Sequence, residues 1–318
     1  MKIEKLTPAF KDYLWGGVKL REVYHKPCDF DKVAESWELS THPAGESRIS
    51  GGEFDGQTLS QYLADNPQAL GENAGAFENF PVLIKFIDAK DPLSIQVHPS
   101  DEYALKVEGE YGKTEMWYVM DCEPGAYLYF GVNREVTTEE FRSRINGNTV
   151  EEVLNRVDVH PGDVFFIESG TIHAIGAGIL ICEIQQNSNC TYRVYDYGRV
   201  GSDGKPRELH IEKALAVSRL TPNPAPDEAH APEDIPGGER TLLAECKYFT
   251  THRYRVDSGI RLTAGEDSFL SLVAMEGSGQ VACEENTVEF VAGDSLFIPA
   301  GTGDITVDGS CTLAVTKV

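Results

Sequence analysis

Residues 161–173 read PGDVFFIESGTIH, and residues 292–304 read AGDSLFIPAGTGD. The second segment begins 131 residues after the first and aligns with it without a gap. Six positions are identical: Gly162/Gly293, Asp163/Asp294, Phe166/Phe297, Ile167/Ile298, Gly170/Gly301 and Thr171/Thr302. In each copy the Gly-Asp pair is typical of a turn, the apolar run of a buried strand and the next glycine of another turn. The repeat predicts two halves of similar β-rich fold; the alternative is two unrelated hairpins with similar turn chemistry.

Short apolar runs between turn residues extend this pattern along the 318-residue chain. Examples are LIKFID at 83–88, ILICEI at 179–184 and LSLVA at 270–274, and 30 glycines and 16 prolines separate such runs. This pattern is typical of a mostly antiparallel β architecture. Helices are expected at four places: at 58–64, after Thr137, after Thr149 and at 208–220. Thr137 with Glu140, and Thr149 with Glu152, have the spacing of a capping box.

A proline-rich acidic segment divides the chain. Residues 221–238 read TPNPAPDEAHAPEDIPGG, with five prolines and no basic residue. Such a composition indicates a linker or a long surface loop. We therefore expect a catalytic domain at 1–220, a linker at 221–238 and a second β domain at 239–318.

Composition excludes several classes of function. The chain has 28 Lys and Arg against 51 Asp and Glu, a formal net charge of −23, and no basic run. This disfavours nucleic acid and anionic membranes as partners, and an anionic substrate must be held by a few locally placed cations. No apolar stretch is long enough to span a bilayer, and the first residues have no secretory signal pattern. Seven scattered cysteines without C-x-x-C predict reduced thiols in a cytoplasm. A monomer or a small homo-oligomer is expected.

The two repeated segments resemble the second motif of the cupin superfamily, G-x5-P-x-G-x2-H. The first copy matches it with Gly162, Gly170 and His173, with Glu168 in place of Pro. The second copy matches with Gly293, Pro299 and Gly301, but Asp304 stands at the position of the His. The resemblance implies a mainly β fold of two cupin-like jelly-roll barrels, with a few helices inserted in or beside the first. It also implies that the second barrel is a metal-free structural copy.

Four residues of the first half are candidate metal ligands. Gln96 and His98 are two residues apart, so on a strand their side chains leave the same face. Glu115 stands just before another apolar run, and His173 ends the turn described above. Two imidazoles, a carboxylate and an amide oxygen suit Zn²⁺, and less decisively Mn²⁺ or Fe²⁺. Each residue taken singly also suits a structural or surface role.

Three cations lie near these residues in sequence. Lys113 precedes Glu115 by two positions, Lys85 lies within an apolar run, and Arg193 lies in an alternating Tyr/Arg/Tyr stretch. The alternative for each is a solvated surface cation. Arg199, Lys205 and Arg207 lie in a glycine-rich loop and are expected to face solvent.

Longer stretches resemble type I zinc-dependent mannose-6-phosphate isomerase (phosphomannose isomerase) in its short bacterial form. The resemblance runs from about Trp15 through Arg199. The stretches that carry it are AESWELSTHP at 34–43, LIKFIDA at 83–89, SIQVHPSD at 94–101, GKTE at 112–115, GTIHAIGAG at 170–178 and QQNSNCTYRVYD at 185–196. Gln-x-His followed by Lys-x-Glu is specific for this family, whereas the last 80 residues match only the general cupin pattern.

The resemblance implies zinc-dependent interconversion of D-mannose 6-phosphate and D-fructose 6-phosphate, with one Zn²⁺ per chain. By position, Gln96, His98, Glu115 and His173 resemble the zinc ligands, and Arg193 resembles the essential active-site arginine. Lys113 is the second catalytic candidate, whereas Lys85, Glu183, Asn189 and Glu35 match substrate-binding positions. The family usually has Asp where this chain has Asn189, and Asn cannot titrate.

This activity suits the residues chemically. Moving a proton between C1 and C2 through an enediol builds negative charge on oxygen, which a Lewis acid stabilises. Lys113, near a metal and other cations, is expected to have a lowered pKa and to handle the proton. Arg193 suits a phosphate or a developing oxyanion. A non-catalytic sugar-binding cupin and an Fe²⁺-dependent cupin dioxygenase remain the alternatives.

Overall fold

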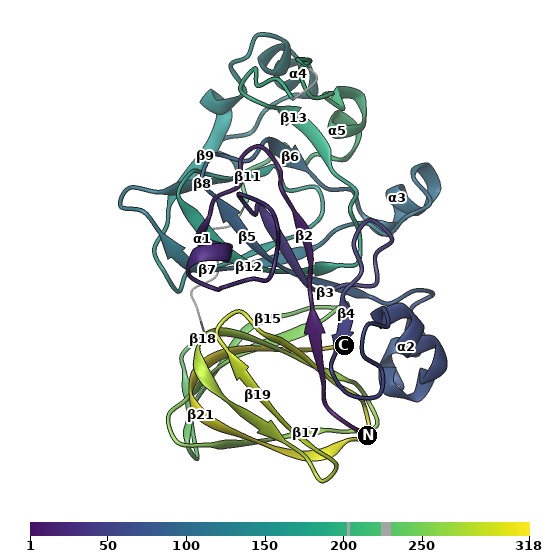
Figure 1. Ribbon diagram of the computed structural model, residues 1–318. Coiled ribbons are helices and arrows are strands. Elements are labelled where there is room, and N and C mark those ends of the chain that lie inside the picture. Colours follow the sequence, from purple (N-terminus) through teal and green to yellow (C-terminus); the bar gives the residue numbers. More distant parts are fainter. Residues whose placement is uncertain (202–203, 224–229) are drawn as a thin grey trace.

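Two antiparallel sheets face one another in the first half of the protein, at the top of Figure 1, which shows the computed structural model. The structure describes residues 1–201, 204–223 and 230–318. One sheet has the strand order β10 (Val164–Ile167), β7 (Glu115–Cys122), β12 (Ile179–Gln186), β5 (Val82–Ala89), β3 (Glu35–Leu39) and β2 (Ala9–Lys11). The other has the order β13 (Tyr192–Tyr195), β6 (Ile95–Val97), β11 (His173–Ile175), β8 (Tyr127–Val132) and β9 (Leu154–Asp158).

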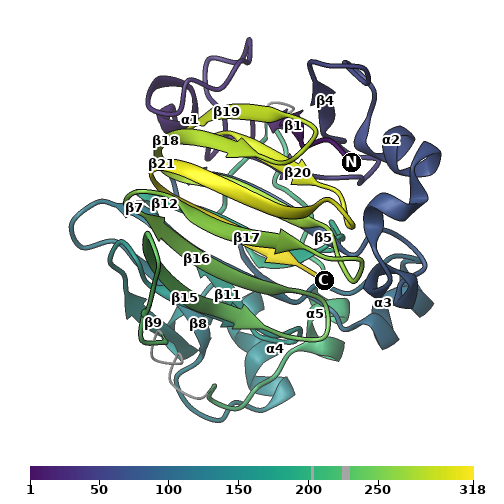
Figure 2. The same cartoon turned by 90° about the horizontal axis from the view of Figure 1, so that it is seen from below.

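A single larger sheet forms the second half (Figure 2). Its ten strands are β14 (Glu233–Ile235), β15 (Gly238–Glu245), β16 (Thr250–Val256), β21 (Gly303–Lys317), β18 (Leu270–Ala282), β20 (Ser295–Ile298), β1 (Glu4–Thr7) and β4 (Arg48–Ser50) in order, with β17 (Ile260–Ala264) on β21 and β19 (Thr287–Val291) on β18. Two of these strands, β1 and β4, come from the N-terminal part of the chain. The division at 220 remains a proposal about folding units, and strand pairing crosses it.

Helices are few and lie around the first half and beside the second (Figure 1). They are α1 (Lys19–Glu22), α2 (Leu59–Asp65), α3 (Asp101–Val107), α4 (Thr138–Asn146) and α5 (Ile211–Val217), with 3-10 turns η1 (Pro67–Leu70), η2 (Asn73–Ala76) and η3 (Val150–Val153). The helices expected at 58–64 and after Thr137 are present. Thr137 accepts the predicted hydrogen bond from the Glu140 N–H, but the Glu140 carboxylate accepts from Arg134 and does not complete the predicted capping box. A complete capping box forms at Thr58 with Gln61, where none was predicted. The helix expected at 208–220 is shorter.

The capping box predicted at Thr149 is wrong. The Thr149 side chain makes no cap hydrogen bond, and only a 3-10 turn follows it. The Glu152 carboxylate that would complete the box instead accepts a hydrogen bond from Arg144. The ion pair between Arg144 and Glu152 therefore forms in place of the cap hydrogen bond that the local spacing predicts.

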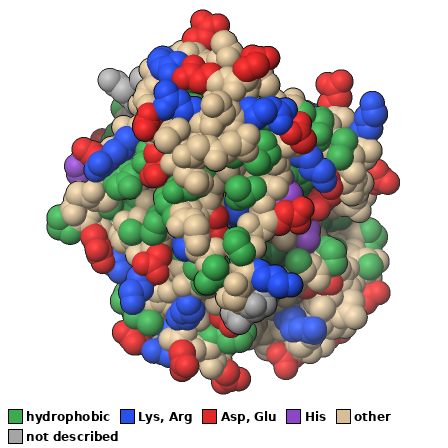
Figure 3. All heavy atoms as spheres, turned by 90° about the horizontal axis from the view of Figure 1, so that it is seen from above, with side chains coloured by type: hydrophobic (Ala, Val, Ile, Leu, Met, Phe, Trp, Pro, Cys, Tyr) green, Lys and Arg blue, Asp and Glu red, His purple; other side chains and the backbone are tan. Residues whose placement is uncertain are grey.

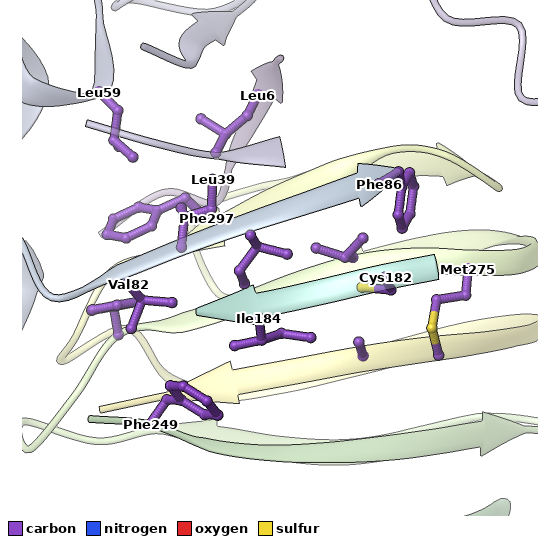
Figure 4. Packing of buried hydrophobic residues seen from close by; sticks show 14 of the residues in the cluster. Leu6, Leu39, Leu59, Val82, Phe86, Cys182, Ile184, Phe249, Met275 and Phe297 are labelled. Carbon is purple, nitrogen blue, oxygen red and sulfur yellow. The ribbon is translucent and has the colours of Figure 1, made fainter. Parts of the chain in front are cut away.

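The two halves share a hydrophobic core, drawn in Figure 4. Side chains alternate between the faces of a strand. In β5 and β12, Ile84, Phe86, Cys182 and Ile184 therefore point to the core shared with the second half. Phe249, Phe269 and Phe297 of the second half are buried in the same cluster. Lys85 and Glu183 lie on the opposite face of the same two strands. Their side chains are therefore buried between the two sheets of the first half.

The repeated segments have the same local structure. Gly162 and Gly293 have φ of 96° and 98°, the region that favours glycine. The following aspartates accept the backbone N–H of the residue three positions earlier, His160 in one copy and Val291 in the other. Both turns then lead into short strands, β10 and β20. The repeat in sequence is therefore a repeat in backbone geometry.

Three observations bear on partners and environment. Among the described residues, no helix has the length and apolarity that a membrane crossing requires. All seven cysteines are free thiols. Figure 3 views the molecule from above the first half, where Lys and Arg side chains are interspersed with Asp and Glu and form no continuous basic surface. The linker expected at 221–238 includes residues 224–229, which lie outside the described residues, and its end already forms β14 and the start of β15.

Candidate metal centre and active site

Three potential metal ligands meet between the two sheets of the first half. His98, Glu115 and His173 are each at most 1% exposed, and one ligand atom from each lies within 4.8 Å of the others. Strand register explains the meeting. Glu115 begins β7, His173 begins β11 opposite Gln96 of β6, and His98 directly follows β6. In the described part of the chain no other group of three His, Cys, Asp or Glu residues has this geometry.

Hydrogen bonds fix both imidazoles with their Nε2 atoms facing each other. His98 Nδ1 lies 2.9 Å from the Cys190 carbonyl oxygen, and His173 Nδ1 lies 2.9 Å from the Thr171 carbonyl oxygen. Carbonyls only accept, so each Nδ1 carries the proton. Burial, reinforced by Lys113, lowers the pKa of His98 well below its usual value, and burial lowers the pKa of His173 to about 4. Two neutral acceptor nitrogens therefore lie 3.2 Å apart.

Glu115 completes the set of acceptors. Its Oε1 lies 3.4 Å from His173 Nε2, and its Oε2 lies 3.6 Å from His98 Nε2. No described residue donates a hydrogen bond to Oε1, although the carboxyl group is buried. Burial raises the pKa of Glu115 to about 7, against the opposing effect of Lys113. Two acceptor nitrogens and a buried carboxylate that converge in this way suit a bound divalent cation.

Gln96 borders the cluster. Its Nε2 lies 3.4 Å from His173 Nε2, and the register of β6 places it opposite both His173 and Arg193. The two ends of a side-chain amide are interchangeable by rotation, so the Gln96 oxygen can take the same place. The four predicted ligands are thus brought together in one location.

Two lysines and two carboxylates form the next layer. Lys113 Nζ lies 2.9 Å from Glu115 Oε2 and 3.4 Å from Glu183 Oε1, and Lys85 Nζ lies 3.4 Å from the same Glu183 oxygen. Lys85 also lies 3.6 Å from Glu35. Register accounts for this, because Glu183 of β12 lies opposite Lys85 of β5. All four of these side chains were candidates from sequence.

The protein's own charges act against the lowered pKa that is expected for Lys113 beside a metal. Burial by itself would lower this pKa, but Glu115 and Glu183 outweigh it and raise the pKa. The same contacts act on Glu183: burial would raise its pKa, but Lys113 and Lys85 lower it to about 2. The protein therefore stabilises Lys113 as an ammonium ion and Glu183 as a carboxylate.

Arginines surround the other end of the site. Arg193 Nε donates to Ser94 Oγ at 3.3 Å, and its Nη1 donates to the Glu208 carbonyl at 2.9 Å. Burial and the nearby Arg207 guanidinium lower the pKa of Arg193. Arg207 and Arg199 both donate to the Asp196 carboxylate.

The expectation that Arg199 and Arg207 face solvent is wrong. Arg207 lines the cavity described next, and Arg199 is part-buried and also donates to the Pro92 carbonyl at 2.6 Å. Their common partner Asp196 draws the loop inward. The contact between Asp196 and Arg207 joins residues that no local pattern connects.

A cavity of about 390 Å³ joins these groups. Seven of the predicted site residues line it: Glu35, Lys85, Gln96, Lys113, Glu183, Asn189 and Arg193. Asn189 is also tied down through its backbone N–H, which donates to Glu110. Five other lining residues were not among the predicted site residues, namely Tyr13, Trp15, Ser94, Thr191 and Arg207. Of these, Ser94 lies two positions from Gln96 and Thr191 lies two positions from Arg193, a same-face spacing on a strand that was a usable signal.

Fold and site together define a class of protein: a two-barrel cupin enzyme with a buried His/Glu/His cluster beneath a cationic cavity. A family model described as phosphomannose isomerase type I, catalytic domain, matches residues 3–127, and a mannose-6-phosphate isomerase cupin domain matches residues 239–318. The Bacillus subtilis mannose-6-phosphate isomerase ManA is 39% identical over 95% of this chain and 94% of its own. The probable mannose-6-phosphate isomerase GmuF of the same organism is 38% identical over 98% and 97%.

Solved structures agree with these relatives. A mannose 6-phosphate isomerase from Bacillus subtilis superposes with a TM-score of 0.92 at 36% identity, covering 100% of both chains. A putative mannosephosphate isomerase from Archaeoglobus fulgidus, at 23% identity and a TM-score of 0.79 over 99% of this chain and 96% of its own, shows the same fold. The chain belongs to the type I mannose-6-phosphate isomerase (phosphomannose isomerase) family. The prediction of a mainly β, cupin-type isomerase is confirmed.

Proposed function

We propose that this chain interconverts D-mannose 6-phosphate and D-fructose 6-phosphate reversibly, with one Zn²⁺ per chain bound in the first half. One observation carries the proposal. Two neutral imidazole nitrogens 3.2 Å apart and an unpartnered Glu115 oxygen adjoin a cavity lined by lysine and arginine. A sugar phosphate needs both features, since one end of it is anionic and the other end must react.

His98, Glu115 and His173 would hold the zinc ion, with Gln96 as fourth ligand. A nitrogen and oxygen set without sulfur is typical of catalytic zinc, which acts as a Lewis acid toward sugar oxygens when bound. Glu115 brings the negative charge to this set. Lys113 lies 2.9 Å from Glu115, so it borders the place where the reacting end of the sugar would lie.

Charge orients the substrate along the cavity. Arg193 is the catalytic arginine of the proposal, and Arg207 adds a second guanidinium to the same wall. Guanidinium groups bind phosphate through paired hydrogen bonds. We place the phosphate at this end, which leaves C1 and C2 toward Gln96 and Lys113. Lys85, Glu35, Glu183 and Asn189 then line the cavity beside the sugar hydroxyls.

Proton handling falls to the charged groups that line the cavity. Asn189 has no titratable group, so the role that an Asp would have there passes to others. Lys113, held as an ammonium ion, would stabilise negative charge that grows on the sugar oxygens and return a proton to them. Glu183 and Glu35 are the carboxylates available nearby.

The expected setting is the cytoplasm, with a phosphorylated hexose as partner, in a monomer or small homo-oligomer. A coupled assay with mannose 6-phosphate, before and after chelation and after zinc is restored, tests the proposal. We expect turnover that disappears with the metal and returns with zinc. Binding of sugar phosphate without turnover would instead indicate a sugar-binding cupin, and oxygen uptake with iron would indicate a dioxygenase.

A further inference from the structure

Three consecutive backbone N–H groups fix the segment that carries Lys113. Gly112 N donates to Asp101 Oδ1 at 2.9 Å, Lys113 N donates to the Pro99 carbonyl at 3.0 Å, and Thr114 N donates to Gln186 Oε1 at 2.8 Å. The segment enters β7 directly, where Glu115 follows. Its conformation therefore sets the position of both Lys113 and Glu115.

Two side chains, Asp101 and Gln186, hold this segment and are hydrogen-bonded to each other. Gln186 Nε2 donates to Asp101 Oδ1 at 2.8 Å. Asp101 begins α3 and Gln186 ends β12, so they come from different parts of the first half. The backbone is closely packed here, because a Cβ on Gly112 would lie only 2.4 Å from the Asp101 backbone nitrogen.

The second half supplies the remaining partner. Tyr248, in the turn between β15 and β16, donates its phenol hydroxyl to Asp101 Oδ2 at 2.8 Å. Burial, together with Asp101, raises the pKa of Tyr248, so the phenol remains the donor. Neighbouring Phe249 is buried in the core shared by the halves, which anchors the turn. The hydrogen bond that orients Asp101 Oδ2 is therefore donated by a residue of the second half, Tyr248.

We propose that Tyr248 is a positioning residue for the isomerisation, acting through Asp101 and Gln186 on the Gly112–Thr114 segment and so on Lys113. On this account the second barrel completes the active site without touching substrate. The proposal rests on the proposed function for its kinetic consequences. Its structural consequence, ordering of residues 112–114, is independent of any activity.

The decisive variant is Tyr248→Phe, with Tyr254→Phe as the matched control. Tyr254 is another mostly buried tyrosine of the second half, and its hydroxyl interacts with Arg240 rather than with the first half. Tyr248 also lines an open cavity of about 710 Å³, so loss of its hydroxyl exposes Asp101 to water rather than leaving a void. The Tyr248→Phe protein should therefore fold.

We expect Tyr248→Phe to lower kcat by about threefold to tenfold, the worth of one hydrogen bond, and to change KM by less than about twofold. In a Lys113→Met background the same change should have a smaller effect on kcat, because one of the two groups that the segment positions is gone. Amide hydrogen exchange at residues 112–114 should quicken in Tyr248→Phe and not in Tyr254→Phe.

Two results would overturn the proposal: unchanged exchange at 112–114, or an equal loss of kcat with and without Lys113. A lower melting temperature with unchanged kcat would reduce Tyr248 to a structural contact. If the wild-type protein fails to turn over mannose 6-phosphate, the proposed function is wrong. The exchange comparison then still decides whether Tyr248 orders the segment.

Discussion

The two halves of this protein have the same turn and strand geometry but different chemistry at equivalent positions. Gly170 N donates to the His98 carbonyl in the first half, and Gly301 N donates to the Gly265 carbonyl in the second. Glu115 lies opposite Ile167 in the first half, and Leu270 lies opposite the equivalent Ile298 in the second. His173 and Asp304 likewise lie opposite Gln96 and Thr263.

The second half therefore has Thr263, Gly265, Leu270 and Asp304 where the first has Gln96, His98, Glu115 and His173. Two of these replacements have no metal-binding side chain at all. Asp304 is exposed and accepts a hydrogen bond from Thr263. The barrel geometry thus does not require the candidate ligands, and among the described residues such a cluster occurs only in the half with the cationic cavity.

The largest expected effect is loss of one ligand in the first half. His173→Ala removes one of two imidazoles, and His98→Ala removes the other. We expect either change to abolish both bound zinc and turnover, because two protein ligands and an amide cannot retain the ion tightly. Isomerase activity and zinc content of purified protein check this. As a control, His252→Ala in the second half should leave both unchanged, and full activity in His173→Ala would refute the ligand assignment.

Arg193→Ala should have the next largest effect, without loss of metal. Removing a charge-assisted contact to phosphate or oxyanion should lower kcat/KM by about two to four decades. Zinc content should stay at the wild-type level, since Arg193 contacts none of the three clustered ligands. Arg253→Ala, in the second half, is the matched control. A loss of zinc in Arg193→Ala would show that Arg193 supports the cluster rather than the substrate.

Lys113→Met should lower kcat more than it raises KM. The ammonium group lies beside the reacting end of the proposed substrate, whereas the phosphate lies at the arginine end. Steady-state kinetics with mannose 6-phosphate separate the two parameters. A kcat close to wild type would reduce Lys113 to a cation that neutralises Glu115 and Glu183.

For stability, unlike for activity, the second copy of the repeat should matter more than the first. Phe297 is completely buried beside Phe269 and Tyr62, and its strand β20 lies between β18 and β1. Phe166 is only partly buried, on the edge strand β10. We expect Phe297→Ala to lower the free energy of unfolding by about 3–5 kcal/mol and Phe166→Ala to lower it by less. Denaturant unfolding measures both; equal losses would contradict this difference between the copies.

Sequence predicted the parts of this structure that depend on local pattern. The repeat, the placement of Gln96 and His98 two residues apart and the helix at 58–64 all follow from neighbouring residues, and the structure has each in place. The difference between His173 and Asp304 at equivalent positions is likewise present in the two repeated segments.

Long-range pairing accounts for what the sequence did not predict. β1 joins the second barrel by pairing with β20, a contact across nearly the whole chain. Arg207 reaches the cavity wall because Asp196 draws its loop inward. The pKa of Lys113 is raised because Glu115 and Glu183 together outweigh burial, and Glu183 comes from the distant strand β12. Each outcome depends on which strands or loops meet, and no local pattern specifies that.

We expect one half of the protein to bind the metal and its structural copy to bind none. Zinc per chain, measured by atomic emission on chelated and reconstituted protein, tests it most directly in the wild type, His173→Ala and Asp304→Ala. We expect one zinc in the wild type, none in His173→Ala and one in Asp304→Ala. Two zinc ions in the wild type, one of them lost in Asp304→Ala, would contradict the claim and make the second barrel a metal site.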